Sequence, residues 1–304
     1  MSARSHLSRI VRRLVERAPF AVIARRRVQQ WAFQDPRLAA KFYAYRPEGT
    51  CYVLPRLTDR GTEGLPVPPK PLWLGYASTP EQYLESGRRR ATRMEEILQA
   101  SSFTLEPQFR ILDFGCASAI MLRWFENIAT CGEAWGVDIA GASIVWCQQY
   151  LSPPFKFATT SSFPYLPFED RYFDFIYAGS VFTHIADLAE AWLLELRRIV
   201  RPGGRLFITI QDDRFLEAVM ERPRSEQRRD LAQRLRSYDK ETNFLSTGFS
   251  MLVIDRVPGH GARGQAHVFY DTEYLHRHWG NFFTAISIVP NALGGDQAGV
   301  VLQR

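Results

Sequence analysis

Between residues 110 and 210, short apolar runs alternate with longer stretches in which apolar and charged residues are mixed. The apolar runs predict buried strands, and the mixed stretches predict helices. The predicted strands are 110–114, 134–138, 156–158, 173–178 and 205–210, and the predicted helices are 120–128, 143–150 and 188–200. Strands that alternate with helices predict a parallel sheet covered on both faces.

Further elements are predicted on either side of this region. A helix is expected over 79–100, because Thr79 is a good N-cap and Pro80 suits a first helical turn. Residues 213–240 are charged and have helical spacing. Two late strands are expected near 282–289 and 299–303.

The first 75 residues have a different pattern. Over residues 5–18 apolar side chains recur every three or four positions and arginines fill much of the other face, which predicts a basic amphipathic helix within segment 1–46. Three interpretations stay open: the helix packs on its own protein or a second subunit, lies on an anionic membrane surface, or is an organellar presequence. Residues 47–75 are rich in proline and glycine and predict an extended arm or linker rather than a packed element.

The charge of the 304-residue chain is unevenly distributed. Residues 1–90 hold 17 Lys and Arg against 7 Asp and Glu, or +10, and residues 91–304 hold 21 against 25, or −4, which gives the net +6. A net negative second part argues against a nucleic-acid partner for the domain predicted there, since phosphates are bound mainly by Lys and Arg. We expect this domain to span 76–304, with 213–265 as an insertion on the substrate side.

Three sequence patterns bear on the cellular compartment of the protein and on whether it binds a metal: apolar runs, a secretory signal and the spacing of cysteines. No run approaches the ~20 consecutive apolar residues that a membrane helix needs. The N-terminus has no secretory signal pattern, and Cys51, Cys116, Cys131 and Cys147 have no metal-ligand spacing. We therefore expect a cytoplasmic protein with reduced thiols and no metal cofactor. Residues 1–30 are candidates for self-association or for peripheral contact with a membrane.

Four segments carry the candidate chemistry. The sequence DFGCASA (113–119) leads from a strand into a helix through small residues, which lets the backbone approach a ligand. The sequence GVDI (136–139) ends a strand in Asp138, whose carboxylate can accept hydrogen bonds from both hydroxyls of a ribose. The others are the stretch LPFEDRYFDFIYA (166–178) and the helix-to-strand turn in LRRIVRPGG (196–204).

These four segments, in this order and spacing, resemble the class I (Rossmann-like) S-adenosylmethionine-dependent methyltransferases. The resemblance is firm over 108–210 and looser over 72–304. It implies an α/β fold with a Rossmann-like, seven-stranded, mostly parallel sheet and an antiparallel final hairpin, which the late strands 282–289 and 299–303 would form. It also implies S-adenosyl-L-methionine as cofactor, with S-adenosyl-L-homocysteine as product.

The resemblance also implies roles for individual residues. The turn would line the methionine side of the cofactor, Asp138 would hold the ribose, and the end of the fourth strand would lie near the transferable methyl group. The implied cofactor residues are Asp113, Gly115, Cys116, Ala117, Asp138, Ile139 (adenine), Ser161, Ser162, Ala178 and Gly179. The chain departs from the family pattern twice: Ala119 replaces the third turn glycine, and Ser161 and Ser162 stand where an acid often contacts the adenine amino group.

His184, just after the fourth strand, is the leading candidate for a general base, since a neutral imidazole accepts a proton near pH 7. Asp212 is a second catalytic candidate, or else an N-cap for the following helix. We expect methyl transfer to a small-molecule or glycan acceptor at oxygen. The alternatives are a nucleic-acid methyltransferase using the basic front segment, a nicotinamide-dependent oxidoreductase, and a non-catalytic S-adenosylmethionine-binding protein.

Overall fold

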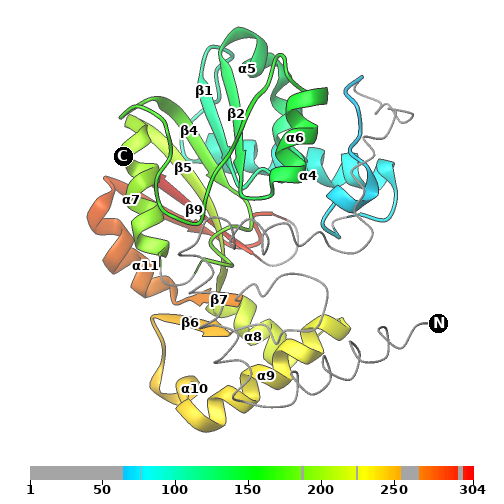
Figure 1. Ribbon diagram of the computed structural model, residues 1–304. Helices are drawn as coiled ribbons and strands as arrows, with labels where there is room; N and C mark the ends of the chain where they lie inside the picture. Colours follow the sequence, from blue (N-terminus) through cyan, green and yellow to red (C-terminus); the bar gives the residue numbers. More distant parts are fainter. Residues whose placement is uncertain (1–63, 76, 186–187, 224, 255–266, 294–296) are drawn as a thin grey trace, which may run out of the picture. The chain divides into compact units, whose positions relative to one another are not determined.

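A central sheet of parallel strands is the framework of the part of the chain that the structure describes (Figure 1). The structure is a computed structural model and describes residues 64–75, 77–185, 188–223, 225–254, 267–293 and 297–304. The chain divides into two compact units, 1–56 and 57–304, and every described residue belongs to the second. The predicted helix of residues 5–18 therefore lies outside the described residues.

The strand order matches the expected fold. The parallel strands are β1 (Arg110–Phe114), β2 (Glu133–Asp138), β3 (Lys156–Thr159), β4 (Phe173–Ala178) and β5 (Val200–Asp212). They pair in the order β3-β2-β1-β4-β5. β9 (Ala298–Gln303) runs antiparallel beside β5, and β8 (Ala285–Val289) pairs antiparallel with β9. The Rossmann-like sheet with an antiparallel final hairpin is thus confirmed.

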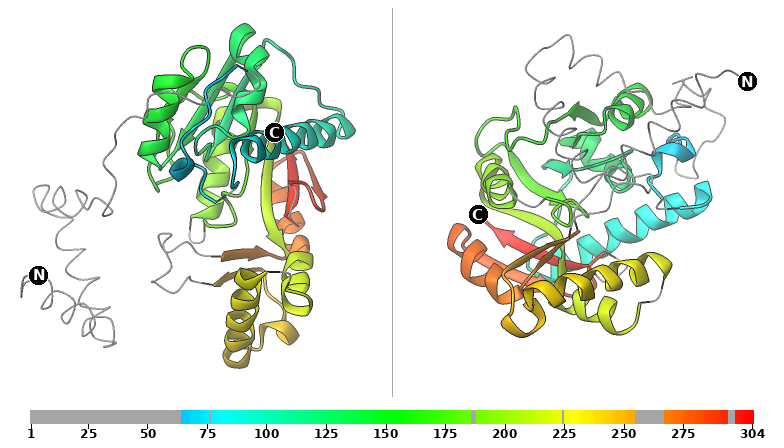
Figure 2. Two further views of the ribbon diagram at one scale, coloured as in Figure 1. Left: turned by 90° about the vertical axis from the view of Figure 1, so that its right-hand side faces the viewer. Right: turned by 60° about the horizontal axis from the view of Figure 1, so that its bottom comes forward.

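Helices cover both faces of this sheet (Figures 1 and 2). One face is covered by α4 (Pro80–Ala100), η2 (Leu122–Phe125), α5 (Glu126–Cys131) and α6 (Gly141–Tyr150). The other face is covered by α7 (Ala189–Ile199), α11 (Thr272–His278) and η3 (Trp279–Phe282). No helix within the described ranges is long and apolar enough to cross a lipid bilayer.

The start of α4 confirms the predicted cap, because the Thr79 hydroxyl accepts a hydrogen bond from the backbone N–H of Gln82. The single helix predicted over 120–128 is wrong. A 3-10 turn, η2, precedes α5 there, and it buries the side chains of Leu122, Arg123 and Phe125. An amphipathic α-helix presents only one stripe to a core, so a tighter turn suits three buried side chains in four residues.

The Pro-Gly-Gly turn is a bulge within β5. Val200 pairs with Phe173 and Arg205 pairs with Phe175, so residues 201–204 stand opposite a single residue of β4. Gly203 has φ +76°, which glycine adopts without strain.

The insertion after β5 contains helices and a two-stranded ribbon. α8 (Asp213–Glu221), α9 (Glu226–Thr242) and α10 (Phe244–Thr247) share an apolar cluster with β6 (Met251–Ile254) and β7 (His267–Tyr270). β7 pairs in parallel with the last residues of β5, and β6 pairs antiparallel with β7. The described sheet therefore has nine strands, two more than the seven expected, because this ribbon extends its edge beyond β5.

The end of the proline-rich arm is packed, so its prediction as an unpacked linker is wrong from Leu65 to Trp73. Val67 and Trp73 are buried in the core beside α4. The buried guanidinium of Arg123 donates hydrogen bonds to the carbonyl oxygens of Leu65 and Pro66. Proline has no backbone N–H to donate, but the carbonyl groups of this segment remain acceptors, and here the Arg123 side chain satisfies two of them.

Candidate functional site

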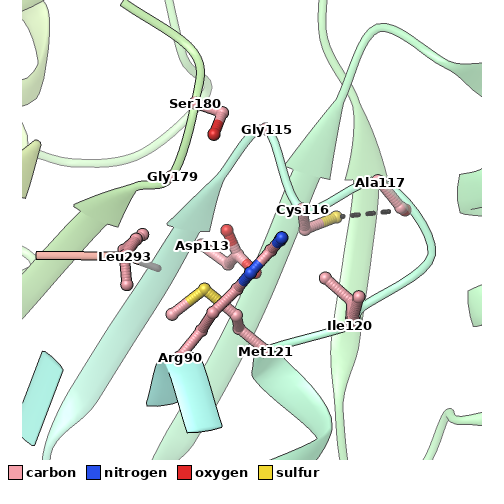
Figure 3. Close-up of a pocket in the computed structure, with 10 residues that line it drawn as sticks. All are labelled: Arg90, Asp113, Gly115, Cys116, Ala117, Ile120, Met121, Gly179, Ser180 and Leu293. Carbon is pink, nitrogen blue, oxygen red and sulfur yellow. Dashed lines mark hydrogen bonds between the residues drawn. The ribbon is translucent and has the colours of Figure 1, made fainter. Parts of the chain in front are cut away.

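A pocket lies at the carboxyl ends of β1 and β4, where an open α/β sheet typically binds its ligand (Figure 3). It encloses about 430 Å³ of space free of protein atoms, part of it open to solvent. Five lining residues were predicted from the sequence: Asp113, Gly115, Cys116, Ala117 and Gly179. Five were not predicted: Arg90, Ile120, Met121, Ser180 and Leu293.

The remaining predicted cofactor residues do not line this pocket. Ile139 is 65% exposed, and Ser161 and Ser162 are exposed after β3. Ala178 is fully buried, and its side chain packs in the core on the α7 side of the sheet. Because side chains alternate along a strand, Tyr177 faces the pocket side and only the backbone of Ala178 is available there.

The turn after β1 has a left-handed backbone at alternate residues. The φ angles are +85° at Gly115, +49° at Ala117 and +62° at Ala119. A Cβ at Gly115 would collide with Val181, so only glycine fits there. For the two alanines this conformation costs about 1–2 kcal/mol each. Ala119 is fully buried in the core and does not line the pocket, so its methyl group leaves the pocket surface unchanged.

Asp138, at the end of β2, is tied to this turn. One carboxylate oxygen accepts a hydrogen bond from the backbone N–H of Ala117, and the other accepts one from the N–H of Ala140, both at 2.7 Å. A carboxylate oxygen has two acceptor sites, so each oxygen of the half-buried Asp138 keeps one for a ligand hydroxyl.

Asp113 is the buried carboxyl group of the pocket. Burial raises its pKa to about 8, the Tyr177 hydroxyl that donates to it at 2.9 Å lowers the pKa, and the nearby Asp138 charge raises it. The side chain of Arg90, on α4, points toward Asp113 across the pocket (Figure 3). The sequence offered one signal for Arg90, its place seven residues after Tyr83 on the same face of a helix.

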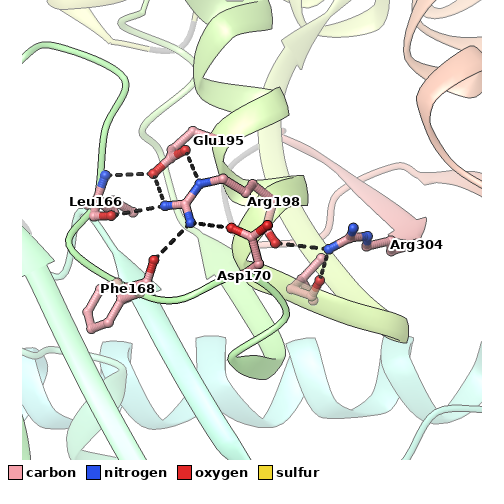
Figure 4. Close-up of polar contacts among 7 residues, drawn as sticks. Leu166, Phe168, Asp170, Glu195, Arg198 and Arg304 are labelled. Carbon is pink, nitrogen blue, oxygen red and sulfur yellow. Dashed lines mark hydrogen bonds and ion pairs between the residues drawn. The ribbon is translucent and has the colours of Figure 1, made fainter.

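A hydrogen-bonded cluster fixes the loop that leads from β3 to β4 (Figure 4). The Arg198 guanidinium donates to both oxygens of Glu195, to Asp170, and to the carbonyl oxygens of Leu166 and Phe168, at 2.7–3.0 Å. Glu195 in turn accepts a hydrogen bond from the backbone N–H of Leu166. The LPFED stretch is therefore held from α7.

Both catalytic candidates lie outside the pocket lining. His184 follows the lining residue Ser180 by four positions and makes an edge-on ring contact with His267 of β7, at 6.2 Å between ring centroids. Asp212 is the N-cap of α8, because its carboxylate accepts a hydrogen bond from the N–H of Phe215 at 3.0 Å. The capping alternative for Asp212 is confirmed. Among the described residues, no group of three or more His, Cys, Asp or Glu side chains is placed to hold a metal ion.

Asp113 makes the stability of the ligand-free protein depend on pH. Its pKa is raised from 3.8 to about 8, so between these values the folded state keeps a proton that the unfolded state releases. Its contribution to the free energy of unfolding is therefore full below pH 4 and falls as the pH rises toward 8. In Asp113→Asn this component should be absent. Denaturant unfolding of both proteins from pH 5 to pH 8 measures it, and parallel pH profiles would contradict a raised pKa.

Arg198→Met should lower the free energy of unfolding by about 2–3 kcal/mol, because it leaves the buried Glu195 carboxylate without its cation. The control is Arg88→Met, whose ion pair with Glu85 is exposed and contributes less than about 1 kcal/mol. Equal losses in the two variants, measured by urea unfolding, would show that the cluster contributes no more to stability than an exposed ion pair does.

Comparison with known proteins gives a consistent assignment. Residues 112–208 match the family described as "Methyltransferase domain". Curated relatives include the ubiquinone/menaquinone biosynthesis C-methyltransferases UbiE of Burkholderia vietnamiensis (strain G4 / LMG 22486) and Burkholderia orbicola (strain MC0-3). Each is 28% identical over 130 residues, which cover 41% of this chain. The match spans about half (51%) of each relative's length.

Solved structures with a similar fold include the PH0226 protein from Pyrococcus horikoshii OT3, with a TM-score of 0.49 and 16% identity over 77% of this chain and 95% of that chain. Another is magnesium protoporphyrin IX methyltransferase (ChlM) from Synechocystis PCC 6803 with bound SAH, with a TM-score of 0.45 and 12% identity over 76% and 90% of the two chains. Residues 112–208 thus match a methyltransferase domain, and the mostly parallel sheet with its antiparallel final hairpin agrees with the Rossmann-like fold that the resemblance to class I S-adenosylmethionine-dependent methyltransferases implied.

Proposed function

We propose that the protein transfers the methyl group of S-adenosyl-L-methionine to an oxygen atom of a small-molecule or glycan acceptor. The observation that carries the proposal is the pairing of the left-handed turn with Asp138. The turn exposes a pocket at the ends of β1 and β4, and Asp138 keeps acceptor sites beside it.

The residues of the site fit this cofactor. The two oxygens of Asp138 can each accept one ribose hydroxyl while still holding the N–H groups of Ala117 and Ala140. At the other end, the Arg90 guanidinium suits the carboxylate of the methionine portion, and Asp113 suits its ammonium group, whose positive charge would favour the ionised form of this carboxyl. Ile139 offers an exposed apolar side chain beside Asp138 for the adenine ring.

When bound, the cofactor supplies an electrophilic methyl group on a positively charged sulfur. The protein then has to align an acceptor with that methyl group and exclude water. Gly179 and Ser180, which follow β4, line the pocket on the side where the acceptor would enter. His184 lies a short distance along the same loop and would remove the proton of an acceptor hydroxyl.

The small-molecule class is supported by charge. The net charge of residues 91–304 is −4, which is unfavourable for a polyanionic nucleic acid. Carbon is a second candidate for the methylated atom, because the curated relatives are named C-methyltransferases. Isotope-labelled methyl donor and analysis of the product's carbon–oxygen or carbon–carbon bond would distinguish the two. Binding without any methyl transfer across an acceptor screen would support a non-catalytic role.

S-adenosylhomocysteine should raise the melting temperature of the protein, whereas NAD should not. Asp138→Ala should weaken S-adenosylhomocysteine binding by about 1.5–3 kcal/mol, the range for hydrogen bonds to a charged group. Asp174→Ala is the control: this carboxylate bonds Arg201 and the Arg110 N–H at the opposite end of the sheet, so its loss should affect stability and not affinity. Stabilisation by NAD alone would refute the methyltransferase proposal.

His184→Gln should lower turnover by about 10²–10⁴-fold, the contribution of a general base, with cofactor affinity little changed. The wild-type rate should rise with pH through the neutral region, and the variant should lack that rise. Asp212→Asn is the matched comparison, because asparagine caps a helix as well as aspartate does. Turnover should therefore persist in Asp212→Asn. Loss of turnover in Asp212→Asn, together with full activity in His184→Gln, would identify Asp212 rather than His184 as the general base.

A further inference from the structure

Ser118 lies in the middle of the turn at 113–119, the cofactor turn. Its side chain connects this turn to two segments that are distant in sequence. Its side chain is 1% exposed and does not line the pocket. The hydroxyl donates a hydrogen bond to the carbonyl oxygen of Leu72, at 2.8 Å, and lies 2.8 Å from the hydroxyl of the fully buried Tyr83. Leu72 belongs to the packed end of the arm, and Tyr83 belongs to α4.

The direction of each hydrogen bond follows from which groups can donate and which can only accept. Ser118 has one hydroxyl hydrogen, and the Leu72 carbonyl can only accept, so Ser118 donates to Leu72. Tyr83 must then be the donor in its bond with the Ser118 hydroxyl, and its longer contact with the Ser118 carbonyl oxygen, at 3.2 Å, is a weaker branch of the same donor. Both hydroxyl groups are thus satisfied only while arm, helix and turn are together.

Close packing of α4 makes this arrangement specific. Gly87 lies one helical turn after Tyr83, and a Cβ there would collide with the carbonyl oxygen of Ile120, just beyond the cofactor turn. Arg90, one turn further along the same helix face, reaches the pocket. One face of α4 therefore contacts Ser118, the backbone at Ile120 and the pocket in succession.

The residues on either side of Ser118 are the two alanines with a left-handed backbone, at φ +49° and +62°. Alanine does not hold this conformation by itself, whereas glycine does. We propose that Ser118 is a positioning residue that, held by Tyr83 and Leu72, keeps Ala117 and Ala119 left-handed. This chain thereby stabilises its cofactor turn with residues 65–73 and α4, whereas the family pattern has a glycine at the position of Ala119.

The consequence for the cofactor follows from the hydrogen bond between the Ala117 N–H and Asp138. If the turn relaxes, that N–H leaves the carboxylate, and only the fraction of molecules with the turn formed can bind; the apparent affinity falls by that fraction. This inference rests on the proposed cofactor only for its binding readout, since the conformation of the turn can be measured without ligand.

The test is a set of variants examined by calorimetry with S-adenosylhomocysteine. Ser118→Ala should raise the dissociation constant about tenfold, from the loss of two buried hydrogen bonds, and Tyr83→Phe should raise it about fivefold. The matched control is Ser101→Ala, which removes a serine bond of similar length to the Leu98 carbonyl at the end of α4. Its dissociation constant should equal that of the wild type.

A second substitution that restores cofactor binding to Ser118→Ala distinguishes a positioning role of Ser118 from a general loss of stability. Ala119→Gly added to Ser118→Ala should restore the dissociation constant to within about threefold of the wild type, because glycine adopts a positive φ without support. It should not restore the melting temperature, since it removes a fully buried methyl group. Failure of the rescue, or unchanged affinity in both Ser118→Ala and Tyr83→Phe, would overturn the proposal.

Hydrogen exchange of the ligand-free protein gives a second readout. Ser118→Ala should speed amide exchange at 117–119 and at 65–73 together, and Ser101→Ala should leave both segments unchanged. If the wild type does not bind S-adenosylhomocysteine, the proposed function fails while this readout still decides the inference. Unchanged exchange in both segments of Ser118→Ala would overturn it.

Discussion

The alternating left-handed backbone at Gly115, Ala117 and Ala119 is the constraint on which the candidate site depends. Positive φ at these residues turns the chain sharply away from β1 and directs the Ala117 N–H toward Asp138 at the end of β2. It also leaves the pocket open beside Gly115, where any side chain would meet Val181. A turn of ordinary backbone conformation would end β1 without joining it to the Asp138 carboxylate.

Parallel pairing supplies the rest of the site. Because β1, β2 and β4 run in the same direction, their carboxyl ends lie at one edge of the sheet and bring together Asp113, Asp138 and Gly179. The same pairing leaves β5 free to run on past β4, and β7 pairs with its final residues. The α8–α10 insertion with its β6–β7 ribbon is therefore attached at the carboxyl end of β5, and it brings His267 against His184.

Buried carboxyl groups are stabilised in two different ways in this fold. Glu195 is largely buried as an anion beside Arg198, which donates to both of its oxygens. Asp113 accepts a hydrogen bond from the neutral Tyr177 hydroxyl, and burial raises its pKa to about 8. The first arrangement fixes a loop permanently, whereas the second leaves a carboxyl group whose charge responds to a cationic ligand, because a nearby positive charge favours the ionised form.

Seven of the nine described strands, and the pocket residues Asp113, Gly115, Cys116, Ala117 and Gly179, could be predicted from the sequence alone. Apolar periodicity and small-residue turns are local signals, and the family's motifs are contiguous in the chain. The folded structure was needed for the parts that depend on contacts between distant segments. It placed Arg90 in the pocket, and Asp212 at a helix cap.

The folded structure also shows that the side chain of Ala178 points away from the pocket and that residues 65–73 pack beside Ser118 and Arg123. The physical reason is the same in each case. Whether a side chain reaches a pocket, a cap or a buried carbonyl depends on which segment lies opposite it, and the Leu65 carbonyl that Arg123 reaches is 58 residues away in the chain.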